Sequence, residues 1–149
     1  MIDRVRKSSL VDKVVVASPH PIEFERADSF VLKDKEDDVL RRFYLCNCEF
    51  GGDTIVRITS DCPMIDPGEI DYAIRYFHCH SYPYVHFAPI DGLDVEVFSF
   101  NLLKEAYFRT TDKGDREHVT PYMKRKTKIS VDTISDFRRV KRLMRGMEK

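Results

Sequence analysis

The stretch Thr54-Ile-Val-Arg-Ile-Thr-Ser-Asp61-Cys-Pro63 places an aspartate directly behind a short run of strand-forming residues. The stretch Lys128-Ile-Ser-Val-Asp132-Thr133 repeats this arrangement later in the chain. In an α/β sheet, ligands bind beyond the carboxyl ends of the strands. Two carboxylates placed there are suited to Mg²⁺ and the phosphates of a nucleotide. Each aspartate also has a structural alternative to metal binding. Asp61 could be an ordinary loop or capping carboxylate, and Asp132 could cap the following helix.

Strand-like and helix-like segments alternate along the chain, which predicts a mainly parallel sheet covered by helices. Strands are expected at residues 13–17, 30–32, 54–59, 84–87, 94–98 and 128–131. Helices are expected at 36–48, from 66 on, at 101–109 and from 133 on, with a polar loop at 110–115 and a short helix or turn at 116–123. The run at 13–17 is continuously apolar, which is typical of a strand buried on both faces.

Size and composition indicate one ordinary globular domain spanning residues 1–149. The formal net charge is zero, so no global field draws the chain to nucleic acid or to a membrane. No apolar run is long enough to span a bilayer, and Met1 does not open a signal peptide. The four cysteines are therefore expected to be reduced thiols of a cytoplasmic protein.

Two clusters of sulfur and imidazole side chains raise the question of zinc. These are Cys46-Asn-Cys48 and His78-Cys79-His80. Their spacings do not fit the common zinc motifs. The first cluster also falls at the end of a predicted helix, where cysteine is usually a small buried hydrophobe. We therefore do not expect zinc.

The segment Asp94-Val-Glu-Val-Phe98 alternates polar and apolar residues. Because side chains alternate across a strand, Asp94 and Glu96 share one face, and Val95 and Val97 share the other. A pair of carboxylates on one face can hold sugar hydroxyls or a metal ion. The alternative is that the pair simply forms the exposed face of the strand.

Five segments appear in a single order that resembles one family. They are Glu36-Asp-Asp-Val-Leu-Arg-Arg-Phe43, Thr59-Ser-Asp-Cys-Pro63, Asp91-Gly-Leu-Asp-Val-Glu-Val-Phe98, Arg116-Glu-His-Val-Thr-Pro-Tyr122 and Ser130-Val-Asp-Thr133. Together they resemble the cytidylyltransferases that make CMP-activated sugars, across nearly the whole chain. The resemblance is strongest to the spore-coat-polysaccharide-biosynthesis branch. The 3-deoxy-manno-octulosonate cytidylyltransferases are more distant.

The resemblance implies a three-layer α/β fold of the nucleotide-diphospho-sugar transferase type, with a mainly parallel sheet. It also implies transfer of CMP from CTP to a sugar hydroxyl, with release of pyrophosphate and use of Mg²⁺. By this resemblance, Asp61 and Asp132 match the two aspartates that bind metal. Arg42 matches an arginine of the helix after the base-binding turn. The segments that line the acceptor-sugar side contain Asp94, Glu96 and His118.

The sequence departs from the family at its start. Family members open with a strand and a phosphate-binding loop of the form Ala-Arg-x-x-Ser-x-Arg-Leu-Pro-Gly-Lys, which has no counterpart here. We therefore expect a fold truncated at the N-terminus, lacking the first strand and the loop that cradles the triphosphate. Exposed strand edges invite pairing, so a reordered sheet, a homodimer through sheet edges or poor solubility is expected. The alternative function is a degenerate, non-catalytic domain that binds a sugar or nucleotide and needs a partner chain.

Overall fold

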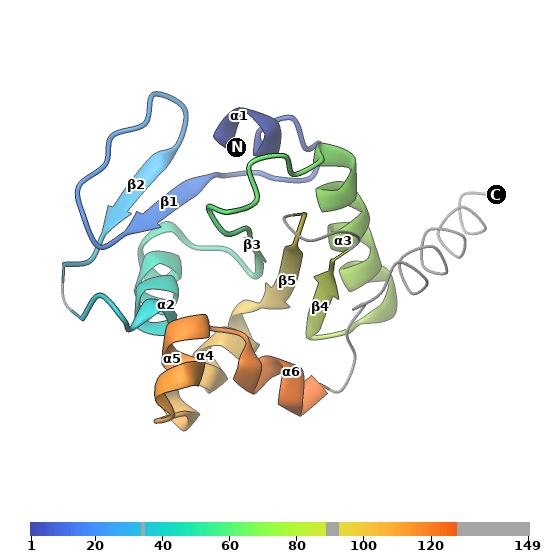
Figure 1. Ribbon diagram of the computed structural model, residues 1–149. Helices are drawn as coiled ribbons and strands as arrows, with labels where there is room; N and C mark the ends of the chain where they lie inside the picture. The colour runs from blue at the N-terminus through green and yellow to red at the C-terminus, as the bar shows by residue number, and fades with distance from the viewer. Residues whose placement is uncertain (34, 89–92, 128–149) are drawn as a thin grey trace.

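The computed structural model describes residues 1–33, 35–88 and 93–127 (Figure 1). The elements are α1 (Ile2–Val5), β1 (Val15–Ser18), β2 (Asp28–Val31), α2 (Val39–Phe50), β3 (Thr54–Arg57), α3 (Pro67–His80), β4 (Tyr84–Phe87), β5 (Val95–Ser99), α4 (Phe100–Arg109), α5 (Lys113–His118) and α6 (Pro121–Thr127). The strand and helix predicted from residue 128 on lie outside the described residues, and so does Asp132. No helix within the described ranges has the length and apolar character needed to cross a membrane.

The strands form two small sheets, which confirms the α/β class and corrects the expected strand directions. β1 pairs with β2 in parallel, whereas β3, β5 and β4 form a sheet in that order with both pairings antiparallel. The described pairings are therefore not mainly parallel. The reason lies in the connection at 88–94, which is too short for the crossover that a parallel neighbour requires, so the chain turns back and β5 runs against β4.

Helices cover both faces of the three-stranded sheet, and each face has its own core (Figure 1). On one face, Val95 and Val97 of β5 pack with Val85 of β4 under α3. On the other face, Phe98 of β5 and Tyr84 of β4 pack against α2, α4 and α6. The alternation predicted for β5 is therefore confirmed. It also places Glu96 on the same face as Phe98.

Local rules explain the start of α3, where the prediction is confirmed. The Asp66 side chain accepts a hydrogen bond from the Gly68 N–H at 2.7 Å, and Pro67 occupies the first turn. The N-terminal part of the chain differs from its prediction. Residues 15–17 of β1 are half-buried rather than fully buried, because β1 pairs only with β2 among the described strands.

The segment predicted as a polar loop at 110–115 instead enters helix α5. Asp112 caps this helix by accepting the Asp115 N–H at 3.0 Å. Arg116 then binds Asp38 through two hydrogen bonds, Nε to Oδ1 at 2.9 Å and Nη2 to Oδ2 at 2.7 Å. Asp38 in turn caps α2 by accepting the Arg41 N–H at 3.1 Å. A pairing across the chain therefore stabilises a helix that local composition does not favour.

We predict that Asp38→Ala lowers the free energy of unfolding by about 2–3 kcal/mol, because it removes both a helix cap and a bidentate ion pair. The measurement is urea denaturation followed by circular dichroism. Asp37→Ala is the matched control, since Asp37 is exposed and precedes the cap; its effect should stay within about 0.5 kcal/mol. Equal losses in the two variants would contradict the role given to Asp38.

Candidate functional site

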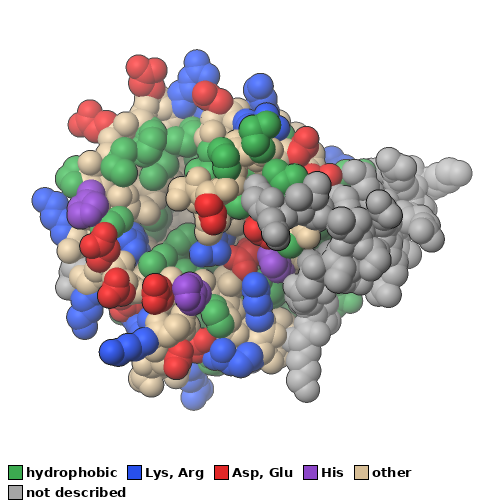
Figure 2. Space-filling view, in the orientation of Figure 1, with side chains coloured by type: hydrophobic (Ala, Val, Ile, Leu, Met, Phe, Trp, Pro, Cys, Tyr) green, Lys and Arg blue, Asp and Glu red, His purple; other side chains and the backbone are tan. Residues whose placement is uncertain are grey.

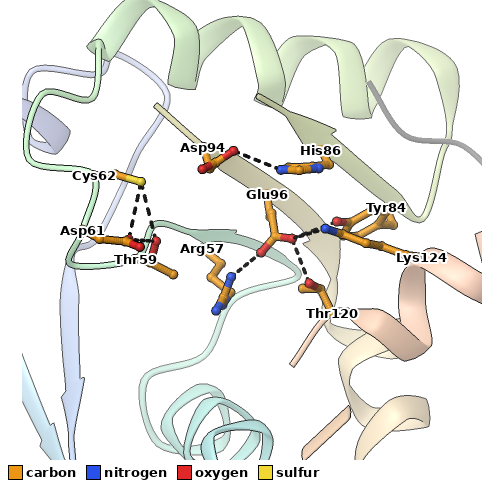
Figure 3. Close-up of polar contacts among 10 residues, drawn as sticks. All are labelled: Arg57, Thr59, Asp61, Cys62, Tyr84, His86, Asp94, Glu96, Thr120 and Lys124. Carbon is orange, nitrogen blue, oxygen red and sulfur yellow. Dashed lines mark hydrogen bonds and ion pairs between the residues drawn. The ribbon is translucent and has the colours of Figure 1, made fainter. Parts of the chain in front are cut away.

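A cleft of about 320 Å³ opens on the face of the sheet that carries Glu96. Its lining comes from β3, β4, β5, α5 and α6 and the segments beside them, and consists of Arg57, Thr59, His86, Asp94, Glu96, His118, Thr120, Pro121 and Lys124. Figure 2 shows acidic, basic and histidine side chains gathered near the middle of this face. Figure 3 shows the polar contacts that connect most of them. The cleft is therefore a polar site rather than an apolar pocket.

The carboxylate of Glu96 is the centre of this network, and only 4% of the residue is exposed. Arg57 of β3 donates to Oε2 from Nη1 at 2.5 Å. The hydroxyls of Tyr84 and Thr120 donate to Oε1 at 2.9 Å and 2.8 Å. The ammonium of Lys124 lies 3.4 Å from the same oxygen. Groups from β3, β4, α6 and the turn before α6 therefore converge on one buried charge (Figure 3).

These partners keep Glu96 ionised. Burial raises the pKa of a carboxyl group, but the charges of Arg57 and Lys124 and the hydroxyls of Thr120 and Tyr84 outweigh it, so the pKa of Glu96 is lowered. Burial, together with the neighbouring Glu96 charge, raises the pKa of Tyr84, so its hydroxyl remains a donor. Both oxygens of the Glu96 carboxylate accept hydrogen bonds from the protein. The carboxylate therefore holds the walls of the cleft together.

The turn between α5 and α6 holds two cleft residues in place. Val119 has φ 71° and ψ −54°, and the Thr120 N–H donates to the His118 carbonyl at 2.8 Å. This is a classic γ-turn, a strained conformation for a β-branched residue and one that costs on the order of 1–3 kcal/mol. The Val119 side chain is fully buried in the core beneath α4 and α6, which holds the turn in shape. As a result Thr120 faces Glu96 and His118 lies at the rim of the cleft.

Asp61 lies in the loop directly after β3, as the sequence predicted, and it is exposed. The Thr59 hydroxyl donates to its Oδ1, and the Cys62 thiol lies 3.7 Å from the same oxygen. The Thr59 hydrogen bond, followed by a backbone N–H and the charge of Arg57, lowers the pKa of Asp61. Its ionised oxygen fits a hard cation such as Mg²⁺. Within the described residues no three His, Cys, Asp or Glu side chains form a complete metal site.

The remaining predicted residues divide into two groups. Asp94 and His118 line the cleft, and Asp94 lies 3.4 Å from Nε2 of His86. Arg42 does not line it. The Arg42 guanidinium is buried, burial lowers its pKa, and it donates to the Glu36 carbonyl at 2.9 Å. The structure thus brings Asp94, Glu96 and His118 together at the cleft and gives Arg42 a partner just before its own helix.

Sequence reasoning missed Arg57, Tyr84, Thr120 and Lys124 as parts of the site. One signal was present, because Arg57 interrupts an otherwise apolar strand, and a charge there is normally paired or functional. The other three carry no such signal. Their importance comes from contacts with Glu96, which is distant from each of them in the sequence.

Comparisons with known proteins converge on one family. A family model described as "Cytidylyltransferase" matches residues 1–145. An uncharacterized protein of Methanocaldococcus jannaschii is 33% identical over 165 aligned positions, which cover 93% of this chain and 68% of that protein.

Two solved structures share the fold. A cytidylyltransferase from Leptospira borgpetersenii superposes with a TM-score of 0.74 at 23% identity, over 86% of this chain and 59% of that one. A CMP:2-keto-3-deoxy-manno-octonic acid synthetase complexed with CTP superposes with a TM-score of 0.65 at 12% identity, over 98% of this chain and 86% of that one. This chain thus spans less than two thirds of the Leptospira protein. The two superpositions confirm the expected nucleotide-diphospho-sugar transferase type of fold.

We predict that Glu96→Gln lowers the free energy of unfolding at pH 7 by about 2–4 kcal/mol, because Arg57 and Lys124 lose their shared anion. The folded-state pKa of Glu96 lies below its ordinary value of 4.5. The stabilisation is therefore present above that pH and is lost as pH falls through the lowered pKa. The gap between wild type and Glu96→Gln should narrow from about pH 5 downward.

Urea denaturation of both proteins at several pH values measures this gap. Asp94→Asn is the control, since that side chain is 40% exposed and its removal should cost less than about 1 kcal/mol. A gap that stays constant between pH 7 and pH 3 would mean that the Glu96 charge contributes no stability.

Proposed function

Because this chain belongs to the cytidylyltransferase family, we propose that it transfers CMP from CTP to a hydroxyl of a sugar acceptor and releases pyrophosphate. The observation that carries the proposal is Asp61, an exposed aspartate in the loop after β3 whose pKa is lowered and whose Oδ1 accepts a hydrogen bond from Thr59 of the cleft lining. The acceptor is proposed to be a precursor of a polysaccharide, as in the spore-coat branch that the sequence resembles. The cytoplasm is the proposed location, because the nucleotide substrate is found there.

The proposed reaction is a displacement at the α-phosphorus of CTP. The acceptor hydroxyl oxygen forms a bond to that phosphorus, the bond to the oxygen that bridges to the β-phosphorus breaks, and pyrophosphate leaves with that oxygen. The hydroxyl proton passes to a basic group of the cleft, for which Asp94 and His118 are placed at the rim. Such reactions depend on positioning and charge neutralisation more than on covalent chemistry.

Mg²⁺ belongs to the proposal as a cofactor, and the chemistry of Asp61 fits it. When bound, Mg²⁺ would neutralise the triphosphate and the charge that develops on the leaving group. Asp61 offers a hard, ionised oxygen ligand held in orientation by Thr59. Asp132 is the proposed second ligand and lies outside the described residues.

Acceptor and nucleotide are proposed to occupy opposite sides of the site. Asp94, Glu96 and His118 belong to the acceptor side, Asp94 and His118 by direct contact and Glu96 by holding the cleft walls. Arg42 supports the nucleotide side without touching the nucleotide, because it holds the Glu36 carbonyl in the turn before α2.

We expect the purified protein to bind CTP in a Mg²⁺-dependent manner, measured by isothermal titration calorimetry, and to release pyrophosphate when an acceptor sugar is supplied. Asp61→Asn should weaken Mg²⁺-dependent binding about tenfold or more and reduce turnover by at least about a hundredfold, with circular dichroism unchanged. Asp53→Asn is the matched control, because Asp53 is exposed and lies at the opposite end of the same strand.

Each outcome of this experiment has a distinct meaning. Binding without pyrophosphate release, across a panel of acceptor sugars, would favour the non-catalytic binding domain. Equal losses in Asp61→Asn and Asp53→Asn would remove the metal role from Asp61. A folded protein that does not bind CTP at all would contradict the proposed function.

A further inference from the structure

Two positive side chains of the cleft converge on a single negative one. Arg57 reaches the Glu96 carboxylate from β3, and Lys124 reaches it from α6. Two positive charges against one negative charge leave this group with a net charge of +1. Side-chain exposure is 17% for Arg57 and 40% for Lys124, so Lys124 is open to solvent at the cleft.

Within the part of the chain that the structure describes, Arg57 has more hydrogen-bond donors than acceptors to receive them. A guanidinium carries five N–H donors, and among the described residues Arg57 donates to one acceptor, Oε2 of Glu96. Its Nε is buried without a hydrogen-bond partner among the described residues. The guanidinium carbon of Arg57 lies over the Phe43 ring, 5.8 Å from its centroid, a cation–π contact that helps to hold the group in place. A planar, restrained guanidinium with unused donors suits a two-oxygen anion.

The other carboxylate of the cleft lies apart from this cationic pair. Asp94 pairs with His86 at 3.4 Å, and Figure 3 shows these two on the opposite side of Glu96 from Arg57 and Thr120. Among the residues that line the cleft, Asp94 thus lies on the far side of Glu96 from Arg57, whereas the exposed carboxylate of Asp61, in the loop after β3, feels the positive charge of Arg57. The separation of Asp94 from Arg57 suits a ligand with hydroxyls at one end and an anionic group at the other.

We propose that Arg57 and Lys124 form an oxyanion-binding pair that takes a carboxylate or phosphate group of the ligand, with Glu96 as the positioning residue that holds the two cations together. The pair would discriminate charged ligands from neutral ones of the same shape. That the ligand is a substrate rests on the proposed function. Binding of the anion does not, because it needs neither Mg²⁺ nor turnover.

The test measures the contribution of the anionic group with two matched pairs of probes. CMP is compared with cytidine, and glucuronate is compared with glucose, by calorimetry or by NMR titration without Mg²⁺. At least one acid should bind about tenfold more tightly than its neutral counterpart, the usual scale of one charge-assisted contact. An increment in the nucleotide pair identifies the oxyanion as a phosphate, and an increment in the sugar pair identifies it as a carboxylate.

Lys124→Gln should reduce the ratio of acid affinity to neutral-probe affinity about fivefold or more, while leaving the affinity for the neutral probes unchanged. Lys126→Gln is the matched control: it lies on the same helix and removes the same charge, but its ammonium pairs with Glu105 outside the cleft. It should leave this ratio intact. Equal effects of the two variants would show unspecific attraction and overturn the proposal.

Arg57 is tested in a background that protects the fold. Arg57→Gln alone leaves a buried carboxylate with fewer partners, so it is combined with Glu96→Gln. The double variant, confirmed as folded by circular dichroism, should lose the preference for acid over neutral probe. Glu96→Gln alone should keep a preference for acid over neutral probe, but a smaller one than wild type, because both cations remain in the cleft without the carboxylate that holds them together. Retention of the preference in the double variant would remove Arg57 from the site.

Failure here is separable from failure of the proposed function. Equal binding of both members of each probe pair, or no measurable binding of any probe, would overturn the oxyanion pair even if Mg²⁺-dependent CTP turnover is present. An acid preference that depends on Lys124 would stand even if the protein proved to have no turnover.

Discussion

The structure depends on the burial of one charge, the carboxylate of Glu96. A buried carboxylate is costly unless opposite charges and hydrogen-bond donors surround it. β5 is the middle strand of its sheet, so the donors must come from both neighbouring strands and from the helices that cover that face. Arg57 stands directly opposite Glu96 in the register of β3. Thr120 and Lys124 attach the start of α6 to the sheet. The cleft is the space left between these walls.

Local rules predicted those parts of the fold that local contacts decide. α3 begins where an aspartate, a proline and a periodic apolar face coincide, and β4 has the predicted bounds. The alternation of β5 correctly placed Val95 and Val97 on one face, which the structure shows to be a core face. Asp61 was correctly expected in the loop behind β3, because a strand ends there and a Cys-Pro pair follows. In each case the deciding contacts lie within one element or its immediate flanks.

The misreadings share a physical cause, which is dependence on distant partners. α5 has Gly114 within it and little helical propensity, and its ion pair with Asp38 lies far away in the sequence. The antiparallel direction of β5 follows from the short connection at 88–94. The alternation of strand-like and helix-like segments along the chain does not indicate this direction. Glu96 has the alternating pattern of a ligand-facing residue. Its carboxylate is instead occupied by Arg57 and by groups from later elements, so no local pattern could assign its role.

The same contacts that stabilise this face also set the chemistry of the cleft. Glu96 holds both cations in place, so an anion would meet an arrangement that needs little reorganisation. That arrangement has costs on the order of 1–3 kcal/mol each, which include the strained turn at Val119 and a buried Arg57 Nε that finds no hydrogen-bond partner among the described residues. The apolar core below, which includes Val119 and Met123, offsets them. Two departures from local preference, the turn at Val119 and the Arg57 Nε, therefore lie beside the cleft, where a functional site is expected to impose them.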